Sequence, residues 1–216
     1  STAYYARFAR IAAEAARVLG NGADAARYDA LFARVRSDFN ARFLGADGVY
    51  REKPDEPYAQ TAQILPLAFD LVPEGQRGAV ASRLAHDIAT NRGGNAYVGV
   101  LGARYVLPVL TATGHAHVAW TAATQTDEPS WGYWTDVLGF TSLGEDWTAG
   151  TRSRNHHFFG AIVEWLYEDY AGMRPAAPGY GVVEFRPGGA TDDRGPVSAS
   201  YESVRGVVAT RWRRTD

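Results

Sequence analysis

Hydrophobic side chains recur at the helical period through most of this chain, and this periodicity restricts its fold more than any other feature. The first stripe runs from Tyr5 to Leu19 and stops at Gly20-Asn21-Gly22. Similar stripes follow, so we expect about seven helices arranged in consecutive pairs. Helix pairs in series, without a short solenoid repeat, are what an α/α toroid requires. The expected helices lie at about 5–19, 28–43, 58–71, 73–88, 98–110, 115–124 and 155–171.

The character of the sequence changes after Gly172. A linker with several prolines and glycines follows, and beyond it apolar and polar residues alternate as they do in strands. Residues 203–206 form a plausible hairpin turn between the last two runs. The expected strands lie at about 182–185, 197–201 and 207–212.

Composition and charge exclude several kinds of partner. The chain has 22 basic and 24 acidic residues and a net charge of -2, so neither nucleic acid nor a membrane is expected as a partner. No apolar run approaches the roughly 20 residues that span a bilayer. Cysteine is absent, which excludes disulfides and thiolate metal sites but is compatible with cytoplasm or export. The chain begins inside a helical pattern without a Met or a signal-like stretch, so we expect it to be part of a longer protein.

Carboxylates, aromatic rings and histidines are concentrated between residues 127 and 157. This stretch contains the adjacent acids Glu145 and Asp146, several Trp and Tyr rings, and His156 beside His157. Glycoside hydrolysis typically uses two carboxyl groups, with aromatic and polar groups that hold the sugar. The stretch can supply one of those carboxylates and much of the surrounding wall.

The same residues also allow ordinary structural roles. Adjacent acids most often lie on the surface, and tryptophans most often pack in cores or loops. Asn155 is a good N-cap for a helix that His156 would begin. His156 and His157 point about 100° apart on a helix, which makes them a poor metal pair. Neither a metal nor a cofactor is therefore expected.

Six short motifs, in a fixed order, resemble glycoside hydrolase family 78, the inverting α-L-rhamnosidases. The likeness covers nearly the whole chain. The motifs are Pro129–Tyr133, Thr141–Trp147, Ser153–Gly160, Glu164–Tyr167, Ala171–Pro175 and Arg186-Pro187.

The resemblance implies a fold and a division into domains. Residues 1–174 would form the C-terminal half of an (α/α)6 catalytic barrel. Residues 175–216 would begin a C-terminal β-sandwich domain with a few antiparallel strands. The expected fold class is therefore mainly α, with a partial (α/α)6 toroid followed by short strands.

The resemblance also implies site residues. Glu145 would be the general base, and His156 would lie in the sugar pocket and hydrogen-bond the bound rhamnose. The substrate would be a rhamnosyl glycoside. The remaining expected substrate-binding residues are Trp131, Tyr133, Trp147 and Asn155.

Two departures from the family pattern qualify these expectations. The family has a Trp immediately before the base, where this chain has Gly144, so one wall of the pocket is altered or filled from elsewhere. The family's general acid belongs to an upstream segment in the first half of the barrel, which this chain lacks. The chain alone is therefore expected to be inactive, to depend on the missing N-terminal half, and to self-associate through exposed apolar faces.

Two other functions fit the same residues. One is a lyase on the same scaffold that cleaves rhamnosyl-uronate linkages by elimination. The other is a carbohydrate-binding remnant without catalysis, which the Gly144 departure favours.

Overall fold

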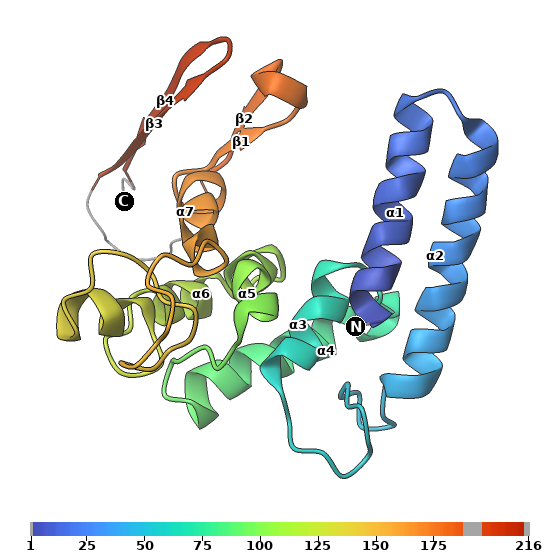
Figure 1. The fold of residues 1–216 in the computed structure, drawn as a ribbon, viewed down its shortest axis with the longest axis horizontal. Coiled ribbons are helices and arrows are strands. Elements are labelled where there is room, and N and C mark those ends of the chain that lie inside the picture. The colour runs from blue at the N-terminus through green and yellow to red at the C-terminus, as the bar shows by residue number, and fades with distance from the viewer. Residues whose placement is uncertain (1, 188–195, 214–216) are drawn as a thin grey trace. The chain divides into compact units, whose positions relative to one another are not determined.

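The computed structural model describes residues 2–187 and 196–213, and this part of the chain is mainly helical (Figure 1). Each predicted helix and strand has a counterpart in it, although some bounds differ. None of the described helices combines the length and apolarity that crossing a membrane demands. The α-helices are α1 (Thr2–Val18), α2 (Gly22–Phe43), α3 (Gln60–Ala68), α4 (Glu74–His86), α5 (Val100–Ala112), α6 (Ala116–Ala123) and α7 (Ile162–Trp165). Short π- or 3-10-helical segments are η1 (Asp87–Asn91), η2 (Tyr133–Val137), η3 (Phe159–Ala161), η4 (Leu166–Tyr170) and η5 (Pro178–Tyr180), and the strands are β1 (Met173–Pro175), β2 (Val183–Phe185), β3 (Val197–Ser203) and β4 (Gly206–Trp212).

The chain divides into two compact units, Ser1–Leu84 and Ala85–Asp216. In the first unit, α1 and α2 form a helical hairpin. Gly20 adopts a positive φ of 71° at the turn between them. The side chain of Asn21 then caps α2 by accepting a hydrogen bond from the backbone N–H of Asp24 at 3.1 Å. The predicted stop and restart of the helix are thereby confirmed.

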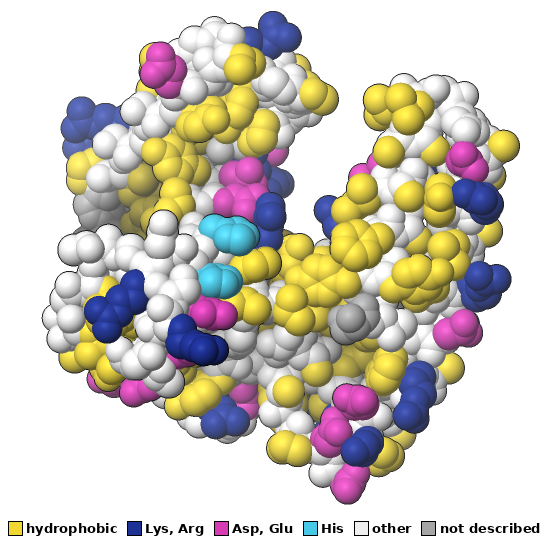
Figure 2. Space-filling model, in the orientation of Figure 1, with side chains coloured by type: hydrophobic (Ala, Val, Ile, Leu, Met, Phe, Trp, Pro, Cys, Tyr) yellow, Lys and Arg dark blue, Asp and Glu magenta, His cyan; other side chains and the backbone are white. Residues whose placement is uncertain are grey.

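Helix α1 packs through its small residues. Its buried positions are all alanines, and Ala6 and Ala13 have no exposed surface. The large apolar residues whose spacing predicts this helix face solvent instead, with Phe8 63% and Val18 88% exposed. Figure 2 shows hydrophobic side chains exposed on the surface of the α1–α2 hairpin. The helix is correctly predicted; its alanines form the buried face and its large apolar residues the exposed one.

The rest of the first unit has a core of larger side chains. Tyr50 is buried, and its backbone N–H and C=O both bond to the buried Gln63 amide, at 3.0 and 2.9 Å. The predicted stripe of α4 is also confirmed, since Val80 and Leu84 are buried. The two bonds between Tyr50 and Gln63 tie the loop before α3 to that helix.

In the second unit, α5 packs against α6, and the last helical segments pack against both. The indole N–H of Trp165 in α7 donates to the Thr111 hydroxyl of α5 at 2.9 Å. The rings of Trp120 in α6 and Tyr170 in η4 stack with centroids 4.5 Å apart. This packing holds the end of the helical region in place.

The last helical region begins later than the sequence predicts. Regular structure starts at Phe159 rather than Asn155, and it passes from η3 through α7 to η4. Phe158 is the residue before the first turn, and the side chain of Asn155 makes no cap bond in the described structure. The prediction that His156 begins a helix is therefore wrong.

In the described part of the chain, four short strands form two antiparallel pairs. β3 and β4 make the predicted hairpin, with Ser203 opposite Gly206. β1 pairs with β2, with Met173 opposite Phe185. The sequence does not predict β1, because it is three residues long and ends at Pro175 in a stretch that reads as a linker.

Candidate active site

The stretch from 142 to 156 folds back on itself and brings the segment of Glu145 beside the segment of His156. The backbone N–H of Glu145 donates to the carbonyl oxygen of Ser153 at 3.0 Å. The backbone N–H of His156 donates to the carbonyl oxygen of Leu143 at 2.9 Å. These two bonds run in opposite directions between the two segments, as in a short antiparallel pair. The two residues of greatest chemical interest are thus placed by one local structure.

The two adjacent acids of this loop differ in their surroundings. The Asp146 carboxylate accepts hydrogen bonds from the backbone N–H of Thr148 at 3.0 Å and from its hydroxyl at 2.6 Å. These bonds hold the pKa of the Asp146 carboxyl below its usual value. Glu145 is exposed, and its carboxylate has no hydrogen-bond or ion-pair partner within the described ranges. Asp146 therefore shapes the loop, while the Glu145 carboxylate remains accessible.

Four aromatic rings pack together beneath this loop. Trp134 stacks on Trp147 with centroids 4.6 Å apart and an interplanar angle of 22°. The ring of Phe159 lies edge to face against both, with its centroid 5.2 Å from that of Trp134 and 4.5 Å from that of Trp147. Trp131 meets Trp147 edge to face at 5.2 Å. The cluster joins the loop to the start of the last helical region.

The structure gives the predicted aromatic residues different roles. Trp131 is buried, and its indole N–H donates to the Phe159 carbonyl at 3.0 Å, so it acts as a packing anchor. Trp147 is only partly buried, and its indole N–H donates to the Val98 carbonyl at 2.7 Å. Tyr133 lies in η2 and is also partly buried. Trp147 and Tyr133 therefore retain exposed surface, whereas Trp131 is buried and packs against the ring of Trp147.

His156 is partly buried in a row of flat rings. Its ring lies 5.7 Å from that of His157 and 5.3 Å from that of Phe158, nearly parallel to both. Its Nδ1 atom is inaccessible to solvent and has no hydrogen-bond partner in the part of the chain that is described. Asn155, next to it, is exposed. A buried polar nitrogen without a partner is costly and is consistent with a functional position.

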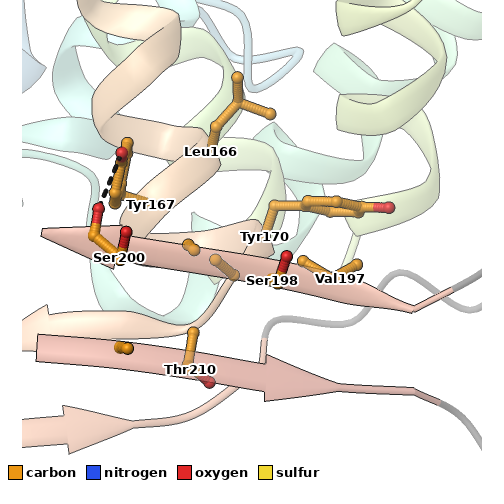
Figure 3. Close-up of a pocket in the computed structure, with 10 residues that line it drawn as sticks. Leu166, Tyr167, Tyr170, Val197, Ser198, Ser200 and Thr210 are labelled. Atoms are coloured by element: carbon orange, nitrogen blue, oxygen red, sulfur yellow. Dashed lines mark hydrogen bonds between the residues drawn. The ribbon is translucent and has the colours of Figure 1, made fainter.

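A separate groove of about 600 Å³ lies between η4 and the β3–β4 hairpin (Figure 3). The Tyr167 hydroxyl donates to the Ser200 carbonyl at 3.2 Å across this junction. Neither Glu145 nor His156 lines the groove. Its labelled lining residues are Leu166, Tyr167, Tyr170, Val197, Ser198, Ser200 and Thr210.

Comparison with known proteins identifies the family. Residues 1–170 match the family model of the bacterial alpha-L-rhamnosidase six-hairpin glycosidase domain. The chain belongs to this family. Its mainly helical fold with a few antiparallel strands is shared with solved α-L-rhamnosidases of the six-hairpin type.

Relatives and solved structures agree with the rhamnosidase family. An alpha-L-rhamnosidase of Streptomyces avermitilis is 38% identical over 99% of this chain, and one of Formosa agariphila is 30% identical over 98%. A crystal structure of the Streptomyces avermitilis enzyme complexed with L-rhamnose superposes on 100% of this chain with a TM-score of 0.87 and 35% identity. The structure of an alpha-L-rhamnosidase from Dictyoglumus thermophilum superposes on 100% with a TM-score of 0.91 and 31% identity.

The chain is much shorter than these rhamnosidases. It covers 21% of the Streptomyces avermitilis relative and 23% of the Formosa agariphila relative. It covers 21% and 24% of the two solved chains. It therefore spans between a fifth and a quarter of their length.

Proposed function

We propose that Glu145 is the general base of an inverting α-L-rhamnosidase that removes terminal α-L-rhamnosyl groups from glycosides or polysaccharides. One observation carries the assignment. Of the two adjacent acids, only Glu145 presents a carboxylate that is free of partners among the described residues and open to solvent. A base must accept a proton from water, so it needs such an accessible carboxylate.

The reaction follows from that role. Water bound beside Glu145 gives a proton to the carboxylate as its oxygen attacks the anomeric carbon. The glycosidic C–O bond breaks, and the leaving oxygen takes a proton from a second carboxylic acid. An inverting site holds the two carboxyl groups about 6.5–9.5 Å apart so that the water fits between sugar and base.

Rhamnose recognition would use the residues beside the base. His156 would hydrogen-bond sugar hydroxyls, and Asn155 adds a second polar side chain next to it. Trp147 and Tyr133 would contact the apolar face of the ring, with Trp131 behind them. The likeness to a Streptomyces avermitilis enzyme that has been crystallised with L-rhamnose supports this substrate.

The proposed acid comes from outside this chain. We place the functional chain in a longer protein whose other half-barrel supplies the general acid, and the length of the matched rhamnosidases supports this. We also propose that the catalytic barrel extends over 1–174 and the β-domain over 175–216. The match of the family model to residues 1–170 supports that boundary.

The base assignment is tested by Glu145→Gln in the full-length protein with a nitrophenyl α-L-rhamnoside. We expect kcat to fall by about 10²–10⁴-fold, the usual size of general-base assistance. In Glu145→Ala, azide should restore turnover by attacking the anomeric carbon directly, and the product should be a rhamnosyl azide of inverted configuration. Asp146→Asn is the matched control, with a much smaller loss of kcat than Glu145→Gln, because the amide oxygen of Asn can still accept the two bonds from Thr148.

Product analysis separates the proposal from its rivals. Proton NMR of the first-formed sugar should show inversion at the anomeric carbon. An unsaturated uronate that absorbs in the ultraviolet would instead identify a lyase. Normal turnover by Glu145→Gln would refute the base assignment, and rhamnose binding without turnover by the full-length wild type would identify a binding protein.

A further inference from the structure

Thr151 lies at the centre of the loop that carries Glu145. Its side chain is buried, with 5% of the residue exposed. Its hydroxyl oxygen accepts a hydrogen bond from the backbone N–H of Glu145 at 3.0 Å and another from the backbone N–H of Asp146 at 3.2 Å. The same hydroxyl donates to the carbonyl oxygen of Ser153 at 3.2 Å. One hydroxyl therefore uses its donor and two acceptor positions on three backbone groups.

The two amides that Thr151 binds stand on either side of the Glu145 Cα atom. The rotations φ and ψ of Glu145 lie between these two nitrogens. Because both nitrogens bond to a single oxygen atom, the backbone of Glu145 has little freedom to rotate. The bond from the Glu145 N–H to the Ser153 carbonyl fixes the same peptide from a second direction.

This restraint matters because the Glu145 carboxylate has no hydrogen-bond or ion-pair partner among the described residues. The direction in which the carboxylate leaves the backbone is then set mainly by the backbone itself. A catalytic group displaced by about 1 Å can lose about a hundredfold in rate.

We propose that Thr151 is a positioning residue for catalysis. It holds the backbone of Glu145 so that the Glu145 carboxylate points at the water beside the sugar. The proposal rests on the proposed role of Glu145. Thr151 does not touch substrate and acts only through Glu145. Its hydroxyl carries the effect, because the hydroxyl makes all three bonds.

A packing role is the competing explanation, and it belongs to the methyl group. The Thr151 Cγ2 atom would lie only 2.9 Å from a Cβ built at Gly144, so the methyl is close-packed against that backbone. Thr151→Val keeps the shape of the side chain and removes the hydroxyl. Thr151→Ser keeps the hydroxyl and removes the methyl. The two variants therefore separate positioning from packing.

The experiment measures kcat, KM and melting temperature of both variants in the full-length protein, with a nitrophenyl α-L-rhamnoside. Thr151→Val should lower kcat by about tenfold or more while KM changes by less than about twofold. Thr151→Ser should keep kcat within about threefold of the wild type. Thr148→Val is the matched control, because it removes a hydroxyl of the same loop that, among the described residues, bonds to the Asp146 carboxylate alone. Its kcat should stay within about threefold.

A double variant tests whether Thr151 acts through Glu145. In a Glu145→Gln background, Thr151→Val should lower the residual kcat by less than about twofold, because the base it positions is already gone. An undiminished effect in that background would assign Thr151 a structural role and overturn the proposal. So would a Thr151→Ser variant as impaired as Thr151→Val. If Thr151→Val does not fold, Thr151→Ser against Thr151→Ala gives the same comparison of hydroxyl against no hydroxyl.

The outcomes also distinguish this proposal from the one on which it rests. Normal turnover by Glu145→Gln would refute the proposed role of Glu145 as the general base. A strong loss in Glu145→Gln together with normal turnover in Thr151→Val would leave the base assignment standing and overturn only the positioning role.

Discussion

The ring of Trp134 occupies the space into which a side chain at position 144 would point. A Cβ atom built on Gly144 would lie 3.1 Å from Cζ2 of Trp134 and 2.9 Å from Cγ2 of Thr151. Gly144 itself is buried, and Trp134 has no exposed surface. Gly144, which stands where we expected the Trp of the family pattern, therefore lies directly against the ring of Trp134.

Gly144→Ala should therefore destabilise the loop. The added methyl forces Trp134 or Thr151 to shift, and overpacking of this kind costs about 1–3 kcal/mol. Gly150→Ala is the matched control, since a Cβ there meets nothing within 4 Å. Thermal unfolding of the full-length variants should show a lower Tm for Gly144→Ala and an unchanged or higher Tm for Gly150→Ala. Equal Tm values for the two variants would contradict this description of the packing.

His156→Ala should weaken rhamnose binding as well as turnover. Loss of a hydrogen bond in a buried polar site costs about 1–3 kcal/mol, which corresponds to about 5- to 150-fold in the inhibition constant of L-rhamnose. His157→Ala is the control, because His157 stacks in the same row of rings but is exposed. We expect inhibition by rhamnose to be nearly unchanged in that variant. If His156→Ala also leaves inhibition unchanged, His156 has only a structural role.

The sequence predicts the helices better than it predicts which face of each is buried. A stripe such as the one through Phe8 marks a helix because large apolar residues recur at its period. It does not reveal that alanines such as Ala6 and Ala13 form the buried face of α1. Periodicity identifies faces, but the choice between two faces depends on which neighbours are present.

For the candidate site too, the sequence predicts the residue types but not their local arrangement. The acids, rings and histidines of the loop are recognisable as a candidate site from their types alone. The start of the last helix is not, because the backbone N–H of His156 bonds to Leu143 instead of entering a helix at Asn155. Thr151 gives no sequence signal, since its role depends on three backbone groups that only the folded loop brings together.

Tyr50 should titrate at an unusually high pH. Burial raises the pKa of its phenol to about 12, and its hydroxyl donates to Oδ1 of Asn40 at 2.6 Å. The folded state therefore holds this proton more tightly than the unfolded state, whose phenol has a pKa near 10.0. The phenol's contribution to stability is complete below pH 10 and is lost as the pH rises towards 12. Ultraviolet difference titration of the wild type against Tyr50→Phe measures this one group. A midpoint near 10 would contradict its burial.

The last prediction concerns residues 1–216 alone, which we expect to be inactive on rhamnosides and to self-associate. We expect no activity because a base without a general acid cannot protonate the leaving oxygen. Helix α1 exposes large apolar residues, including Tyr5, Phe8 and Val18, the last 88% exposed. Contiguous apolar surface of this kind drives association in water.

Light scattering and a rhamnosidase assay on the purified chain test both parts. Phe8→Lys should shift the mass towards a monomer, because it places a charge within the apolar face. Val204→Lys is the matched control: Val204 is 90% exposed at the β3–β4 turn, away from α1 in the sequence, and its replacement should leave the mass unchanged. Turnover by a monodisperse wild-type monomer would mean that the acid lies within these residues. A wild-type monomer without turnover would instead show that the face of α1 is tolerated in water, and the acid would still have to come from elsewhere.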